Sequence, residues 1–273
     1  MGRAIADRDL RSRVVIATKT GLEWKDGKVF RNANRDRILH EVEDSLRRLR
    51  TDYIDIYQVH WPDPLVSIEE TAEAMQTLFD QGKIRAIGVS NFSVAQIERF
   101  RRLAKLHVVQ PPYNLFEREI ENELLPYCRK SNLATLTYGA LCRGLLSGKL
   151  QGDAHFGGDD LRLTDPKFQP PRYSQYLAAV RRLDQFARHR YVKSVIHLAV
   201  RWLLDQGATT ALWGARHPGQ LQPIDEVFGW LLDATAKAEI DRILRNSITD
   251  PVGPEFMAPP PRPRAELFQA AAQ

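Results

Sequence analysis

The stretch SLRRLRTDYIDIYQVH, residues 45–60, contains the end of a helix and the strand that follows it. The run from residue 53 to residue 59 is rich in β-branched and aromatic residues, which is typical of a strand, and it ends at His60. Upstream of this run, apolar residues recur at three- and four-residue steps, as on the buried face of an amphipathic helix: Ile38, Val42, Leu46 and Leu49. The stretch therefore predicts one helix-to-strand unit of a parallel α/β fold.

The same alternation of short apolar runs and longer amphipathic segments repeats along the chain. Runs typical of strands lie at residues 14–18, 84–89, 107–110, 134–138 and 209–212. Several segments between them begin at residues that cap helix amino termini: Asn34, Ser67 with Glu70, Ser93 with Gln96, and Asp233. We expect about six parallel strands in one domain over residues 1–250, followed by an irregular Pro-rich tail over residues 251–273.

This periodicity fits two architectures, a doubly wound sheet and an eight-stranded barrel that is short of two strands. A nucleotide-binding doubly wound sheet usually has the motif G-x-G-x-x-G after its first strand, and the sequence has no such motif. Residues able to do chemistry instead follow successive strands: Lys19, His60, Ser90, Asn91, Gln110, Tyr138 and Arg216. In a barrel these positions face one mouth, where the active sites of that fold lie.

Composition argues against several classes of protein. The chain has 273 residues, of which 43% are hydrophobic, and its net charge of +5 is spread along the sequence, so we expect no nucleic-acid binding. Its two cysteines, Cys128 and Cys142, have no partners at metal-ligand spacing, so we expect no metal site and a reducing, cytoplasmic compartment. Charges interrupt every apolar run, so we expect no membrane span. Nothing in the sequence indicates an oligomeric state.

The strand-end residues suggest a chemistry by their types alone. An ammonium and an imidazole at neighbouring strand ends, from Lys19 and His60, can polarise a carbonyl group. The amides and hydroxyl of Ser90, Asn91 and Gln110 suit a planar amide partner, and Tyr138 offers a face for stacking. Each residue alone also has an ordinary interpretation as a solvated charge, a core histidine or a loop cap.

Several long motifs make the chain resemble the aldo-keto reductases from Arg13 to about Asp250. They are IATK at 16–19, the stretch 45–60, KIRAIGVSNF at 83–92, Gln110 with Tyr113-Asn114, and YGALCRGLL at 138–146. The motifs occur in the family's own order. The resemblance implies a (β/α)8 TIM-type barrel that acts on a small-molecule carbonyl substrate, with Lys19 and His60 as catalytic residues.

The resemblance also implies NADPH as the cofactor. Ser90, Asn91 and Gln110 would hold its carboxamide, and Tyr138 would stack on its nicotinamide ring. The pyrophosphate would lie along Leu141, Arg143 and Gly144, under a strap at residues 157–160. The adenosine ribose would lie at Gly214, Arg216 and Gln220, where Arg216 is suited to pair with a 2′-phosphate, although Trp213 stands where the family usually has proline.

Two residues that the resemblance leads us to expect have no matching position in this chain. They are the tyrosine that donates the proton and the aspartate that supports the lysine, which in the family precede the helix whose end is seen here near Gly2. We therefore expect a truncated barrel that lacks its first two strands, with impaired reduction of aldehydes and ketones. The alternatives are a non-catalytic NADPH-binding regulatory protein, and a remnant that does not fold stably because an opened barrel exposes two strand edges.

Overall fold

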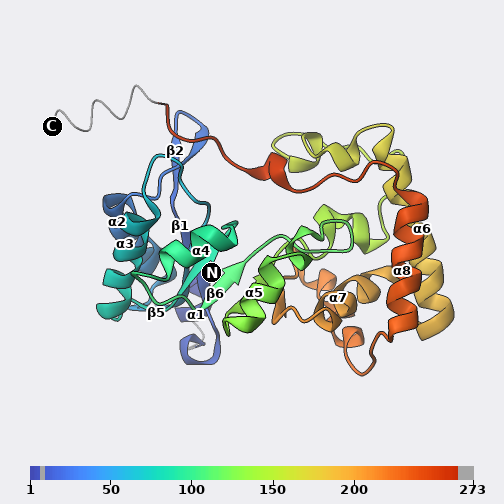
Figure 1. Cartoon of the computed structure of the whole chain (residues 1–273), viewed down its shortest axis with the longest axis horizontal. Coiled ribbons are helices and arrows are strands. Elements are labelled where there is room, and N and C mark those ends of the chain that lie inside the picture. The colour runs from blue at the N-terminus through green and yellow to red at the C-terminus, as the bar shows by residue number, and fades with distance from the viewer. Residues whose placement is uncertain (7–9, 264–273) are drawn as a thin grey trace. The chain divides into compact units, whose positions relative to one another are not determined.

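The computed structural model describes residues 1–6 and 10–263, and the chain forms two compact units (Figure 1). Unit 1 contains residues 1–110 and 126–134, together with the end of the chain from Ala258. Unit 2 contains residues 111–125 and 135–257. We describe each unit by itself.

Unit 1 is built on four parallel strands in the order β1-β4-β5-β6. They are β1 (Ala17–Thr20), β4 (Ile54–Val59), β5 (Ile84–Ser90) and β6 (Val108–Gln110). The register places Lys19 opposite Gln58, Gln58 opposite Gly88, and Ser90 opposite Gln110. Because the strands are parallel, the residues at their carboxyl ends lie at the same edge of the sheet.

Three helices of unit 1 begin where the sequence predicts, after Asn34, Ser67 and Ser93. The helices of this unit are α1 (Gly2–Ala6), α2 (Arg35–Leu49), α3 (Ile68–Asp80) and α4 (Val94–Phe100), with a short 3-10 helix at Arg11–Arg13. The side chains of Asn34, Ser67 and Ser93 cap α2, α3 and α4, and Ser93 forms the full predicted capping box with Gln96. The capping box predicted for Ser67 and Glu70 is formed only in part. The Ser67 side chain accepts from the Glu70 backbone, but the Glu70 carboxylate accepts the backbone N–H of Arg35 and not that of Ser67.

Two parts of unit 1 differ from the prediction. A β-hairpin of β2 (Leu22–Lys25) and β3 (Lys28–Arg31) replaces the loop expected after Lys19. Its turn is Asp26-Gly27, with φ of 49° and 74°, as a two-residue type I′ hairpin turn requires. The first strand also begins at Ala17 rather than at residue 14, and the side chain of Val15 is 73% exposed.

Unit 2 packs helices around an aromatic core. Its elements include the parallel pair β7 (Ala134–Thr137) and β8 (Thr210–Ala211), and the helices α6 (Arg172–Tyr191), α7 (Val195–Asp205) and α8 (Ala234–Ser247). The helix α5 (Leu124–Lys130) and the start of β7 lie where the chain passes between the units. Trp202 is fully buried with its ring 5.2 Å from that of Tyr113, and the ring of Phe116 meets Tyr176 at 4.9 Å.

The loop between β7 and α6 and the carboxy-terminal segment are almost without regular structure. The loop contains three 3-10 helices, at Cys142–Ser147, Leu161–Leu163 and Pro166–Phe168. Two more follow β8, at Pro218–Gln220 and Gln222–Val227, and the last one, Glu255–Met257, lies in the Pro-rich segment. The predicted irregular tail fits the described residues up to 263, and its remainder lies outside them.

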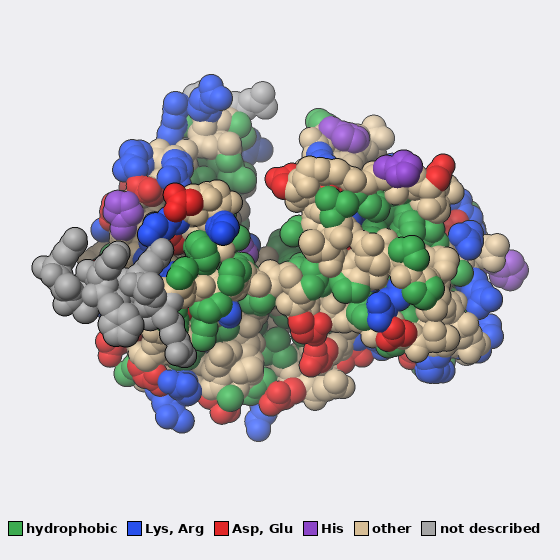
Figure 2. Space-filling view, turned by 90° about the horizontal axis from the view of Figure 1, so that it is seen from above, with side chains coloured by type: hydrophobic (Ala, Val, Ile, Leu, Met, Phe, Trp, Pro, Cys, Tyr) green, Lys and Arg blue, Asp and Glu red, His purple; other side chains and the backbone are tan. Residues whose placement is uncertain are grey.

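Three features of the described residues concern possible partners: surface charge, the composition of the helices, and the placement of possible metal ligands. On the face shown in Figure 2, basic and acidic side chains are interspersed over both units. None of the described helices combines the length and the apolar composition that crossing a bilayer requires. Over residues 1–6 and 10–263, no group of three or more histidine, cysteine or acidic side chains is placed to hold a metal ion.

Candidate functional site

Lys19 and His60 come together at the carboxyl ends of β1 and β4. The two strands are paired, and the backbone N–H of His60 donates to the carbonyl of Thr20 at 2.9 Å. Both side chains are half-buried. Burial, followed by the nearby charge of Lys19, lowers the pKa of His60 to about 4, and burial lowers the pKa of Lys19. At neutral pH the pair is therefore an ammonium group beside a neutral imidazole.

A group of amides and a hydroxyl adjoins this pair, and we call it the amide cluster: Gln58, Ser90, Asn91 and Gln110. The Asn91 side-chain amide donates to the carbonyl of His60 at 3.0 Å and to Ser90 Oγ at 3.1 Å. The Ser90 hydroxyl donates to the carbonyl of Gln110 at 2.8 Å. The cluster thus connects His60 on β4 to the ends of β5 and β6, as the sequence predicts for three of its four members.

Gln58 is the member that the sequence analysis missed. Its Nε2 donates to Gln110 Oε1 at 2.8 Å, and its side chain occupies space that exists only because residue 88 is glycine. A Cβ at Gly88 would lie 2.6 Å from Gln58 Cγ. The signal in the sequence was a polar residue inside an otherwise apolar strand, two positions before His60 and therefore on the same face.

The cluster fits a carboxamide partner. Gln58 Oε1 is buried and has no hydrogen-bond partner among the described residues, and such an orphan acceptor is costly unless something donates to it. Asn91 adopts φ of 62°, a left-handed conformation that costs on the order of 1–3 kcal/mol and that clusters at functional sites. Planar amides and a hydroxyl are the donors and acceptors that a nicotinamide carboxamide requires.

Tyr138 and the turn after it lie in unit 2. The backbone of Tyr138 makes two hydrogen bonds to the segment 111–113. Its carbonyl accepts the N–H of Tyr113 at 3.0 Å, and its N–H donates to the carbonyl of Pro111 at 3.0 Å. Its ring is half-buried, and burial raises the pKa of its hydroxyl far above the ordinary value, so Tyr138 stays protonated. It is therefore suited to stacking and not to acid–base chemistry near neutral pH.

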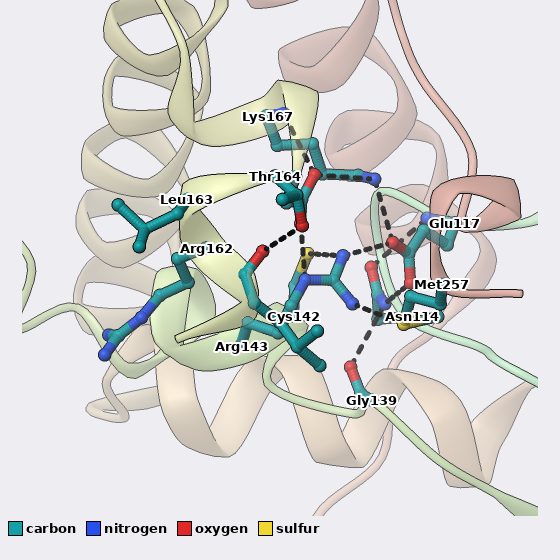
Figure 3. A network of polar contacts seen from close by, with 12 residues as sticks. Asn114, Glu117, Gly139, Cys142, Arg143, Arg162, Leu163, Thr164, Lys167 and Met257 are labelled. Carbon is teal, nitrogen blue, oxygen red and sulfur yellow. Dashed lines mark hydrogen bonds and ion pairs between the residues drawn. The ribbon is translucent and has the colours of Figure 1, made fainter. Parts of the chain in front are cut away.

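The turn that contains Leu141, Arg143 and Gly144 has an unusual backbone. Cys142, Arg143 and Gly144 have consecutive positive φ values of 44°, 51° and 96°. Only the last is glycine, so this backbone conformation is unfavourable for the two other residues and must be stabilised by the surrounding structure. The Arg143 guanidinium forms ion pairs with Glu117 and Asp165, and Figure 3 shows it pointing toward Glu117. What Arg143 can offer a pyrophosphate is therefore its backbone.

The predicted adenosine end is an exposed turn that Gln220 organises. Gln220 Oε1 accepts the backbone N–H of Arg216 at 2.6 Å, and the Gln220 carbonyl accepts from the Trp213 indole at 3.1 Å. Gly214 and Arg216 are exposed. Hydrogen bonds from Arg162, assisted by the charge of Arg216, lower the pKa of Asp160 to about 2. The predicted strap residue Asp160 thus lies within electrostatic reach of Arg216.

The environment of His60 predicts a pH-dependent stability. Its pKa is about 4 in the fold against 6.5 for the ordinary side chain, so the unfolded chain binds the proton more tightly and stability falls as the pH drops from about 6.5 to about 4. Between pH 7 and pH 5 the loss should be on the order of 2 kcal/mol. Urea unfolding at both pH values should show a smaller loss for His60→Gln than for wild type. The exposed control His189→Gln should lose as much stability between pH 7 and pH 5 as wild type does. An equal loss in wild type and both variants would contradict the burial of His60 as a neutral group.

Comparison with known proteins identifies the family. A sequence model described as the aldo/keto reductase family matches residues 1–245. The aldo-keto reductase YhdN of Bacillus subtilis is 62% identical over 263 residues, which are 96% of this chain and 80% of the relative. The NADH-specific methylglyoxal reductase of Escherichia coli is 34% identical over 228 residues, which are 78% of this chain and 68% of the relative.

Solved structures show the same relationship. The chain resembles a glycerol dehydrogenase from Gluconobacter oxydans with a TM-score of 0.85 and 51% identity, over 94% of this chain and 79% of the other. It resembles an aldo/keto reductase from Klebsiella pneumoniae in complex with NADP and acetate with a TM-score of 0.66 and 27% identity, over 92% and 78%. The fold is therefore α/β, of the barrel type of these reductases.

These comparisons include almost all of this chain, and they do not support the expected amino-terminal truncation or the expected impairment. The comparisons likewise do not support the expected absence of two barrel strands. The comparisons and the sequence motifs agree on the family. This chain belongs to the aldo/keto reductase family.

Proposed function

We propose that this protein is an oxidoreductase that passes hydride between NADP(H) and a small aldehyde or ketone. The observation that carries the proposal is the placement of Lys19 beside His60 at neighbouring strand ends, with the amide cluster bonded to the His60 carbonyl. The family acts on small-molecule carbonyl compounds, and a solved relative holds NADP. The names of two relatives, a methylglyoxal reductase and a glycerol dehydrogenase, favour short substrates with neighbouring oxygens.

The residues of this chain divide the work between them. NADPH, when bound, supplies the hydride. The amide cluster would hold its carboxamide through Ser90, Asn91 and Gln110, and Tyr138 would stack on its ring. The Lys19 ammonium would stabilise negative charge that develops on the substrate oxygen, and the neutral His60 would donate a hydrogen bond that orients this oxygen.

A non-catalytic NADPH-binding protein is the second candidate, and one observation favours it. Among the described residues, no hydrogen bond or ion pair joins the side chain of Lys19 or His60 to a carboxylate or to a tyrosine hydroxyl. General acid catalysis by a positioned donor contributes about 10²–10⁴-fold to a rate. A protein with the cofactor residues and without such a donor would bind NADPH and turn over slowly.

One assay distinguishes the two candidates. NADPH fluorescence titration of the purified chain measures binding, and absorbance at the NADPH band measures its oxidation with methylglyoxal and with glyceraldehyde. Binding with substrate-dependent oxidation supports the reductase. Binding without oxidation supports the second candidate, and a chain that binds no NADPH overturns both.

Replacing Arg216 should change the choice of cofactor. Arg216 is exposed in the turn organised by Gln220, so its guanidinium is suited to a charge-assisted bond with a 2′-phosphate. We expect Arg216→Ala to weaken NADPH binding by about tenfold or more, because bonds to charged groups are worth about 1.5–3 kcal/mol, and to leave NADH binding unchanged. The control is Arg245→Ala, a basic residue of the last turn of α8. Equal losses for NADPH and NADH would contradict the assignment.

A further inference from the structure

Four charged side chains meet inside unit 2, and we call them the buried charge network: Glu117, Arg143, Asp165 and Lys167. The Glu117 carboxylate accepts from Arg143 Nη2 at 2.6 Å and from Lys167 Nζ at 2.8 Å. Asp165 pairs with Arg143 Nε and lies 3.7 Å from Lys167 Nζ. Figure 3 shows Arg143 and Lys167 pointing toward Glu117.

The network is almost completely withdrawn from water. The side chains of Asp165 and Lys167 are 0% exposed, and that of Glu117 is 2% exposed. Burial alone would raise the pKa of Glu117, but Arg143 and Lys167 outweigh it, and the pKa lies below its ordinary value. Two positive and two negative charges therefore balance, and removing any one of them leaves a buried net charge.

Through Glu117 the network reaches the segment that begins at Tyr138. Asn114 Nδ2 donates to Glu117 Oε2 at 2.7 Å and to the carbonyl of Gly139 at 3.1 Å (Figure 3). Gly139 directly follows Tyr138, and Arg143 lies in the middle of the left-handed turn. Glu117 is therefore linked to this segment at two points, directly to the Arg143 side chain and through Asn114 to the Gly139 carbonyl.

The same network also fastens the carboxy-terminal segment of unit 2. Lys167 Nζ donates to the carbonyl of Gly253 at 3.0 Å, Arg143 Nη1 lies 3.5 Å from Met257 Sδ, and the Arg143 guanidinium lies 5.1 Å from the Phe256 ring centroid. The Arg143 side chain thus contacts Met257 and Phe256 as well as its two carboxylate partners.

We propose that Glu117 is a positioning residue for the cofactor segment 138–144, and that through Arg143 and Asn114 it sets the affinity for the nicotinamide and pyrophosphate portion of NADPH. The proposal rests on the proposed function. A turn with three successive positive φ values is a minor conformation of a free chain. When the binding-competent form is only partly populated, the apparent affinity falls by that fraction.

The test is Glu117→Gln, which keeps the shape of the side chain and removes its charge. Arg143 and Lys167 then share a single carboxylate, that of Asp165, and the turn is no longer held from the Glu117 side. We expect the Kd for NADPH, measured by fluorescence titration, to rise about tenfold or more, as when the competent turn is populated a tenth of the time. We expect the Kd for adenosine 2′-phosphate, which has neither the nicotinamide nor either phosphate of the pyrophosphate, to stay within about twofold of wild type.

Two further variants make the result decisive. Glu239→Gln makes the same chemical change in a surface ion pair of unit 2, with Arg242, and should leave both Kd values unchanged. Arg143→Lys keeps the positive charge but loses the fork that spans Glu117 and Asp165, and should repeat the selective loss of NADPH affinity.

The outcomes separate the inference from the function on which it rests. If wild type binds no NADPH, the proposed function fails and the inference fails with it. If wild type binds NADPH and Glu117→Gln binds it equally well, or if the variant loses affinity for NADPH and for adenosine 2′-phosphate in equal measure, only the positioning role is overturned. If neither Glu117→Gln nor Arg143→Lys folds, the network serves the fold alone, and the positioning role is likewise overturned.

Discussion

Lys19→Met is expected to lower kcat for aldehyde reduction by about 10²–10³-fold, the loss typical of removing one group that stabilises a developing oxyanion. The half-buried ammonium of Lys19 lies at the end of β1, next to the neutral His60 on β4. Methionine keeps much of the volume of the lysine and none of its charge. The interaction that is lost strengthens in the transition state, so kcat should fall far more than the affinity for NADPH.

The matched control for this change is Lys105→Met. Lys105 is an exposed lysine of unit 1 that precedes β6, so its charge lies at the amino end of a strand and not at the carboxyl end. Steady-state rates at saturating NADPH, together with fluorescence titration, give kcat and Kd for both variants. A Lys19→Met protein that keeps a tenth or more of the wild-type kcat would remove Lys19 from the chemistry.

Local signals explain why most helices and strands could be predicted from the sequence. Caps act within one helical turn, so Asn34, Ser93 and Asp233 mark the starts of α2, α4 and α8 correctly. Strand ends carry the polar residues of the site, which is why Lys19, His60 and Asn91 were found together. The hairpin of β2 and β3 was missed although Asp26-Gly27 is a strong local signal for a two-residue turn.

The parts that the sequence could not show depend on contacts between distant residues. Glu117, Asp165 and Lys167 stand in loop-like, polar stretches where charges are usually solvated, and Glu117 precedes the other two by about fifty positions along the chain. Nothing local indicates that they are buried together around Arg143. For the same reason the family resemblance, which implies a place for Arg143 along the pyrophosphate, does not show that its side chain faces Glu117.

Gln58 was missed for a related reason. Its position within β4 is visible in the sequence, but its contact with Gln110 depends on the register of β4, β5 and β6 and on the missing side chain of Gly88. Register is a property of the folded sheet and not of one strand.

The largest effect on stability should come from Lys167→Met. Lys167 is fully buried, and its ammonium bonds to Glu117 and to the carbonyl of Gly253. Methionine fills most of the space, but it leaves two carboxylates with only Arg143 to balance them. Breaking a buried pair by removing one partner typically costs about 3–5 kcal/mol, so we expect the free energy of unfolding of unit 2 to fall by that amount. Urea unfolding is followed through tryptophan fluorescence, to which unit 2 contributes Trp202, Trp213 and Trp230 and unit 1 contributes Trp24 and Trp61.

The exposed residue Lys149 provides the control, since Lys149→Met should change this free energy by less than about 0.5 kcal/mol. The double variant Glu117→Gln with Lys167→Met separates charge from packing. It restores a balance of one cation, Arg143, and one anion, Asp165, so it should be no less stable than Lys167→Met alone even though it carries one more substitution. If the two changes instead add, or if Lys167→Met is as harmless as Lys149→Met, then the charges of the network are not what holds these segments together, and their packing is.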